Sequence, residues 1–198
     1  MATRLTRTEQ VERNRELVLG AARRIFLERG YTGATLEAIA EAAGFSKGVV
    51  YSQFGGKPDL FLALLKRRST ERAAENAAIA AAHAGLEGLR ELLRTNLRRT
   101  EQGRDWAHVL MEFRVAATRD PELNRRYAEL HNHTMERFAE AVQDVLARGG
   151  LATVHPPRLF AELIFSLDAG HVLEQAAGTA QAAPADLDLL VTRLVEPL

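Results

Sequence analysis

The residues best suited to chemistry lie in a segment predicted to be a short helix from Lys47 to Gln53. Val50 and Phe54 are four residues apart, so they share one face of that helix and can anchor it to neighbouring helices. The side chains left nearer the solvent are those of Lys47, Val49, Tyr51 and Ser52. An ammonium group and a phenol exposed on a short helix suit contact with the phosphates and base edges of DNA.

The segment before this helix supplies the rest of a compact motif. Thr35 is a candidate N-cap for a helix from Leu36 to Ala43, and Gly44 gives that helix a left-handed stop. Ser46 is placed to cap the helix that follows. Two short helices around a tight turn form a helix-turn-helix, whose second helix presents its first residues to the major groove. The alternative is a small three-helix core that needs the same turn only for packing.

Longer helices are predicted on both sides of this motif. The first runs from about Thr8 to Arg29 and stops at Gly30. Its apolar face is formed by Val11, Val18, Ala22, Ile25 and Phe26. After the loop that ends at Lys57, Pro58 suits the first turn of a helix running to about Ala82. The N-terminal tail, with Arg4 and Arg7, is interpreted as a polar tail, the alternative being an arm that enters the minor groove.

The remaining sequence also follows the helical period, with few β-branched runs, so the predicted fold is all-α with about nine helices and no strand pair. Glycine and proline breaks separate the last five helices. These are placed near Leu86 to Glu101, Asp105 to Thr118, Glu122 to Arg148, Pro157 to Ala177 and Pro184 to Val195.

Composition narrows the possible functions. The chain has 198 residues, 46% of them hydrophobic, and its net charge is +0. Through Arg72 there are 13 basic and 8 acidic residues, a net +5, and the remainder has 13 basic and 18 acidic, a net −5. The first third is therefore the part suited to a phosphate backbone.

The absence of cysteine excludes disulfides and thiolate chemistry. The sequence also contains no run of about 18 apolar residues, which is the length that a membrane-spanning helix needs. A cytoplasmic protein, associated with the nucleoid when bound to DNA, is expected.

The sequence around the motif resembles a known family. The run ATLEAIAEAAGFSKGVVYSQFGGK, from Ala34 to Lys57, is similar to the DNA-binding segment of TetR-type transcriptional regulators. AARRIFLERGY, from Ala21 to Tyr31, resembles the first helix of that family, and the match covers about residues 10–72. The resemblance implies a helix-turn-helix domain over residues 1–56 and a ligand-binding and dimerisation domain over 57–198, connected by the helix at about 58–82. It also implies a homodimer that binds a palindromic operator on double-stranded DNA and releases it when a small molecule binds.

The same resemblance implies roles for individual residues at the DNA. Thr35 and Lys57 correspond to phosphate contacts, and Tyr51 to an aromatic whose hydroxyl reaches phosphate. Lys47, Gly48 and Val49 open the recognition helix. Lys47 corresponds to a contact with guanine or phosphate, Gly48 permits close backbone approach, and Val49 corresponds to a contact with a thymine methyl. Gln53 stands where the family often has histidine. The full predicted DNA-binding set is Thr35, Lys47, Gly48, Val49, Tyr51, Ser52, Gln53 and Lys57.

The second domain is predicted to hold a dimer interface and an effector site. The helix from Pro157 to Ala177 is apolar on more than one face, which favours an intersubunit helix bundle over a wholly intramolecular core. Its predicted interface residues, together with those of the last helix, are Leu163, Leu167, Gly170, Leu190 and Leu194. A small, largely apolar effector is expected to lie among Trp106, His108, Met111, Glu112, Phe113, Phe138, Phe165, Asp168 and His171. Ordinary core packing is the alternative for each of these.

No metal or cofactor is predicted. His108, Glu112, Asp168 and His171 could be drawn as ligands, but no established metal-binding motif contains them. The chain has no nucleophile elbow, P-loop or dinucleotide fingerprint, so an enzyme is not expected. The alternatives are a helical binding or adaptor protein with a degenerate DNA surface and, less favoured, a helical enzyme.

Overall fold

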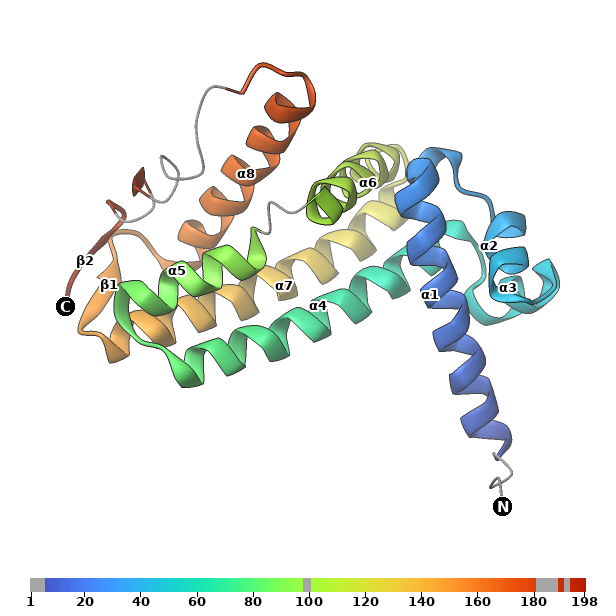
Figure 1. The fold of residues 1–198 in the computed structure, drawn as a ribbon, viewed down its shortest axis with the longest axis horizontal. Coiled ribbons are helices and arrows are strands. Elements are labelled where there is room, and N and C mark those ends of the chain that lie inside the picture. The colour runs from blue at the N-terminus through green and yellow to red at the C-terminus, as the bar shows by residue number, and fades with distance from the viewer. Residues whose placement is uncertain (1–5, 98–100, 181–188, 191–192) are drawn as a thin grey trace. The chain divides into compact units, whose positions relative to one another are not determined.

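The computed structural model describes residues 6–97, 101–180, 189–190 and 193–198. The chain divides into two compact units, the first formed by residues 1–68 and 109–124 and the second by residues 69–108 and 125–198. The elements are labelled in Figure 1. Within the described part, no helix is both long and apolar enough to cross a membrane.

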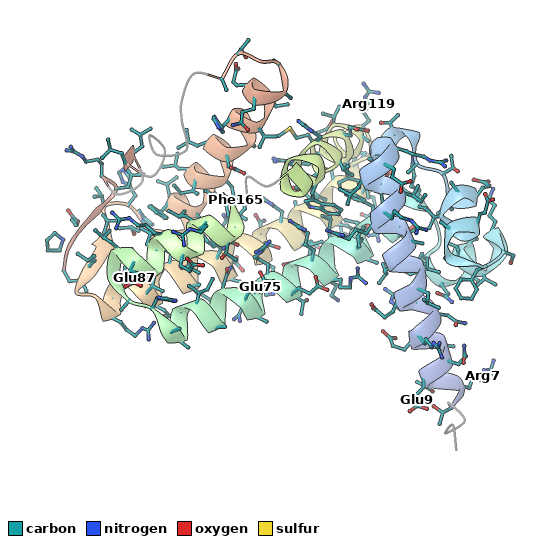
Figure 2. The ribbon with its side chains drawn as sticks, viewed as in Figure 1. Arg7, Glu9, Glu75, Glu87, Arg119 and Phe165 are labelled. Atoms are coloured by element: carbon teal, nitrogen blue, oxygen red, sulfur yellow. The ribbon has the colours of Figure 1, made fainter. Side chains whose placement is uncertain are left out.

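The first unit contains the three N-terminal helices and the beginning of the fourth. These are α1 (Arg7–Gly33), α2 (Leu36–Ala43), α3 (Lys47–Phe54) and α4 (Lys57–Ala82). Gly30, with φ of 69° and ψ of 174°, breaks the helical geometry inside α1, so the predicted stop is confirmed and a further turn follows it. Val11, predicted to lie on the apolar face of this helix, is half exposed. The buried residues of α1 begin at Val18, so its first turns, where Figure 2 labels Arg7 and Glu9, extend beyond the buried segment.

An aromatic cluster forms the centre of the first unit. Phe26 of α1, Tyr31 and Phe61 of α4 lie with ring centroids 5.0 to 5.8 Å apart. Phe113 joins them at 4.6 Å from Phe61 and 5.1 Å from Tyr31. Aromatic rings at such separations stabilise a core beyond their buried area. The segment 109–124 therefore packs with the N-terminal helices, a partnership that was not predicted from the sequence.

The second unit is built from α5 (Gly85–Asn96), α8 (Pro157–Ala176) and parts of α4, α6 (Glu101–Ala117) and α7 (Pro121–Arg148). Its core combines residues of four of these helices, among them Ala80, Leu92, Val142 and Phe160. A buried amide pair also joins α4 to α5, because the Asn96 side chain donates to Asn76 Oδ1 at 2.7 Å. Figure 1 shows α4, α5 and α7 side by side in this unit.

Three predicted features differ from the structure or lie outside its described residues. The predicted helix ending at Glu101 stops at Asn96, and α6 already begins at Glu101. Two short strands, β1 (Leu151–Thr153) and β2 (Val195–Pro197), pair antiparallel with Ala152 opposite Glu196, although no strand was predicted. Segments of three residues are too short to show a period of two, and their partners are far apart in sequence. Most of the predicted last helix, from Pro184 onward, lies outside the described residues, and its last residue, Val195, is in β2.

Candidate nucleic-acid interface

The helix-turn-helix is formed by α2 and α3 with the caps that the sequence predicted at α2. Thr35 Oγ1 accepts a hydrogen bond from the amide of Ala38 at 3.2 Å, and its own backbone is extended. Gly44 ends α2 in the left-handed conformation, with φ of 76° and ψ of 26°. Ser46 precedes α3 at the N-cap position, but its side chain forms no capping hydrogen bond. The hydroxyl of Ser46 therefore plays no part in starting α3.

Two contacts fix α2 and α3 against α1. The guanidinium of Arg15 lies over the ring of Phe54, 4.5 Å from its centroid, and Arg24 donates to the carbonyl of Ala42 at 3.3 Å. Val50 and Phe54 are both buried, as their spacing predicted. The inner face of α3 is therefore held in place, and the opposite face remains free for a partner.

The outer face of α3 consists of the polar side chains predicted there. Tyr51 is 59% exposed, and Lys47 and Ser52 are also exposed. Gly48 is exposed as well, and a side chain added there would meet only Ser46 Oγ, at 3.9 Å. Val49 is half-buried. Donor groups and bare backbone thus occupy one accessible helix face, and groups of this kind suit contact with DNA.

Lys47 is engaged by a neighbouring carboxylate. Its ammonium forms an ion pair with Glu37 of α2, and both side chains are more than half exposed. The hydrogen bond from Lys47 is the main cause of the lowered pKa of Glu37. Because an exposed pair of this kind is weak, Lys47 can exchange Glu37 for a phosphate.

Two predicted contacts differ in geometry from the rest of the set. Gln53 is half-buried, and its amide oxygen is enclosed with no hydrogen-bond partner in the described structure. Lys57 is half-buried, and its ammonium donates to the carbonyls of Tyr31, Thr32 and Ala34 at 2.9, 3.3 and 3.0 Å. An ammonium has three N–H groups, so these carbonyls account for all the donors of Lys57. The ammonium of Lys57 thus faces these carbonyls, whereas the resemblance implied that it contacts a phosphate.

The second unit presents an apolar surface along α8. Leu163 and Leu167 are 39% and 45% exposed, and Leu159, one turn earlier, is 40% exposed. Gly170 lies on the same side, and a Cβ added there would meet no atom within 4 Å. Leu190 is exposed as well, whereas Leu194 is half-buried against the core of this unit. Four of the five predicted interface residues are thus accessible.

The inward face of α8 changes from apolar to polar along its length. Its first half contributes Phe160 and Ile164 to the core, and Phe165 packs edge-on against Phe138 at 5.3 Å. In its second half, His171 is only 8% exposed. The Nε2 of His171 and the Oε1 of Gln175 are buried with no hydrogen-bond partner in the described structure. The Nε2 of His108, on α6, is in the same situation. Buried polar atoms normally have partners, so these positions are candidates for contact with a ligand.

The predicted effector set does not lie in one unit. Met111, Glu112 and Phe113 belong to the first unit, whereas Trp106, His108, Phe138, Phe165, Asp168 and His171 belong to the second. Phe113 packs in the aromatic cluster, and Glu112 accepts a hydrogen bond from the amide of Thr32 at 2.8 Å. Phe113 therefore has packing partners in the first unit and Glu112 has a hydrogen-bond partner there, as the alternative of ordinary packing allows. Among the described residues, no three histidine, aspartate or glutamate side chains are grouped as metal ligands would be.

Comparison with known proteins identifies the family. Residues 18–64 match the model of bacterial regulatory proteins of the tetR family, and residues 85–198 match the C-terminal domain of BetI-type transcriptional repressors. The chain belongs to the TetR family of transcriptional regulators. The resemblance stated from residues 10–72 is confirmed, and the second match extends the relationship to the end of the chain.

Individual relatives agree with this assignment. The HTH-type transcriptional repressor AcnR of Corynebacterium efficiens is 32% identical over 189 residues, covering 93% of this chain and 94% of the relative. A TetR-family structure from Mesorhizobium loti superposes with a TM-score of 0.70 at 24% identity, over 96% of this chain and 97% of its own. The regulator FadR of Bacillus subtilis, solved with stearoyl-CoA, gives 0.69 at 18% identity over 90% and 94%. The two structures share the fold of this regulator.

Proposed function

We propose that this TetR-family regulator is a repressor that binds a palindromic operator as a homodimer and releases it when a small molecule binds. The observation that carries the proposal is the outer face of α3, where Lys47, Tyr51 and Ser52 are exposed beside the open backbone of Gly48. A helical enzyme or an adaptor has no need for that set of donors on a helix anchored in this way.

At the DNA, the proposed contacts divide by chemistry. Tyr51 and the N-terminal end of α2 at Thr35 bind phosphates, because a hydroxyl and free helix amides favour an anion. At the start of α3, Lys47 binds a phosphate on any sequence and also suits guanine, and Val49 suits the thymine methyl in the major groove. The two copies of α3 then read half-sites about 34 to 36 Å apart, or a multiple of that distance.

The proposed dimer forms through α8. Leu159, Leu163 and Leu167 recur every four residues, so they form one continuous apolar stripe along the helix. Gly170 lies beside this stripe with open space before it, which allows a second helix to approach closely. A second copy of the chain supports the symmetry that a palindrome requires.

Repression is supported by the relatives, since AcnR is named a transcriptional repressor and shares most of its length with this chain. The proposed site of action is the cytoplasm, at the nucleoid, because that is where a bacterial regulator meets its DNA.

The proposed effector binds along the inward face of α8. Phe138 and Phe165 supply an apolar wall, and His171 and Gln175 supply polar atoms that have no partner in the described structure. A largely apolar molecule with one or two hydrogen-bonding groups fits this combination. The stearoyl-CoA bound by the Bacillus subtilis FadR is consistent with a ligand inside this fold.

Coupling between ligand and DNA is proposed to pass through the helices shared by the two units. The 26 residues of α4 extend about 39 Å at 1.5 Å per residue, and α4, α6 and α7 each begin in one unit and end in the other. A ligand that shifts α4 would change the separation of the two copies of α3. Couplings of about 1 to 3 kcal/mol, or about 5- to 150-fold in affinity, are usual.

Reciprocity between the two binding sites tests this function with any compound that binds the protein. A compound that raises the melting temperature of the protein is selected, and its affinity is measured with and without saturating operator DNA. We expect DNA to weaken binding of the compound by the same factor by which the compound weakens DNA binding. Equal affinities in both conditions would contradict ligand-dependent release, and His171→Leu serves as the variant that should lose the compound.

A further inference from the structure

Lys57 joins the two ends of the helix-turn-helix. The carbonyls that it binds, from Tyr31, Thr32 and Ala34, belong to the turn that leads into α2, whereas Lys57 itself is the first residue of α4, just after α3. Its ammonium also lies 4.7 Å from the ring centroid of Tyr31. A single side chain therefore links the residues immediately before α2 to those immediately after α3.

The carboxylate of Glu112 holds the same turn from α6. Its Oε2 accepts a hydrogen bond from the amide of Thr32 at 2.8 Å. The turn approaches so closely that a Cβ on Gly30 would collide with this carboxylate. Gly30 also has a φ of 69°, so glycine is favoured here both by backbone geometry and by the space that Glu112 occupies.

The positive charge of Lys57 is opposed by the negative charge of Glu112. Burial lowers the pKa of Lys57, and the negative charge of Glu112 opposes that shift. The ammonium of Lys57 already has carbonyl partners and a nearby carboxylate. Moving it to a phosphate would break these interactions, so the net gain is smaller than for a lysine in water.

We propose that Lys57 and Glu112 are positioning residues of the DNA interface, which lock the turn before Thr35 and so fix α2 and α3 without touching DNA. The inference rests on the proposed DNA-binding function. It gives Lys57 a role different from that of a phosphate clamp, and it gives Glu112 a role in DNA binding although it lies on α6.

The salt dependence of DNA binding shows whether Lys57 positions the turn or contacts a phosphate. Affinity for a random-sequence DNA duplex is measured over a range of salt concentrations for the full-length protein, Lys57→Met and the control Lys47→Met. Each lost phosphate contact reduces the slope of log affinity against log salt by about 1. We expect this loss for Lys47→Met and an unchanged slope for Lys57→Met, with affinity lowered at every salt concentration.

A slope reduced by about 1 in Lys57→Met would overturn the inference while leaving the proposed function intact. If the unaltered protein showed no salt-dependent DNA binding, the proposed function would fail, and the inference with it.

Glu112 is tested by a conservative rescue. Glu112→Ala should lower DNA affinity about tenfold with the slope unchanged, because a hydrogen bond to a charged group is lost. Glu112→Gln keeps an oxygen acceptor for the Thr32 amide and should recover most of that loss. Hydrogen exchange at the Thr32 amide should be faster in the alanine variant and close to the original rate in the glutamine variant. Unchanged exchange in Glu112→Ala would contradict the role assigned to Glu112, even if that variant were less stable.

Discussion

The exposed face of α3 and the exposed face of α8 differ in chemistry. On α3 the accessible groups are an ammonium, a phenol and a hydroxyl, whereas on α8 they are leucines spaced four residues apart. Both helices have an opposite face buried in their own unit. Exposure alone therefore does not indicate which kind of partner a helix face binds. Donor groups suit phosphate and bases, whereas a continuous apolar stripe suits a second protein surface.

The largest expected effect comes from placing a charge in the apolar stripe. Leu163→Asp should weaken dimerisation at least about 100-fold, because symmetry places the unfavourable carboxylate in the interface twice. Sedimentation should then show a monomer at micromolar concentration, and binding to a palindrome should fall with it. Leu17→Asp, at a half-exposed leucine of α1, is the matched control and should remain dimeric. A dimeric Leu163→Asp would remove α8 from the proposed interface.

A smaller effect is expected when a donor is removed from α3. Tyr51→Phe loses the hydroxyl proposed to bind phosphate, so DNA affinity should fall about tenfold, near the lower end expected for one hydrogen bond to a charged group. The dimer mass should not change. Tyr127→Phe removes a hydroxyl from the second unit and is the control, with DNA affinity unaltered. If the two variants bind DNA equally well, Tyr51 is not a contact.

The smallest effect concerns the ion pair that engages Lys47. Glu37→Gln frees the ammonium for DNA, and affinity should rise by no more than about fivefold, since exposed pairs contribute about 1 kcal/mol or less. Glu41→Gln changes the net charge equally on the same helix and should have a smaller effect. Equal gains in both variants would show that only net charge matters.

The same pair predicts a pH dependence. The pKa of Glu37 is lowered in the folded protein, mainly by the hydrogen bond from Lys47, so the pair stabilises the fold above the ordinary pKa of 4.5. That stabilisation disappears as the pH falls through the lowered value. In Lys47→Ala, an NMR titration of the Glu37 carboxyl should show its pKa moved upward. An unmoved titration would mean that Lys47 does not hold this carboxylate in solution.

The sequence predicted the helix-turn-helix and the start of α4 in detail because the signals for these elements are local. Thr35, Gly44 and Pro58 mark helix ends through capping and backbone preference, and the spacing of Val50 and Phe54 indicates the buried face of α3. All of these features lie within a few residues of the structure they determine.

Predictions based on distant contacts were less successful. The partners of Lys57 are backbone carbonyls, and no residue type reveals them in advance. Glu112 contacts Thr32, 80 residues away in sequence, so its place in the first unit could not be read from its own helix. The short pairing of β1 with β2 is missed for the same reason. The predicted domains are residues 1–56 and 57–198, whereas the first compact unit also contains residues 57–68 and 109–124, and the second of these segments is distant in sequence from the N-terminal helices.

We expect two copies of α3 to read a symmetric DNA site, and this expectation underlies the proposed function. It is tested most directly by selecting DNA from a random-sequence pool through repeated binding to the protein and then measuring the mass of the complex. We expect enrichment of a palindrome, with half-site centres about 34 to 36 Å apart or a multiple of that distance, and a symmetric assembly with one protomer on each half-site. No enrichment, or a single asymmetric site bound by one protomer, would contradict it.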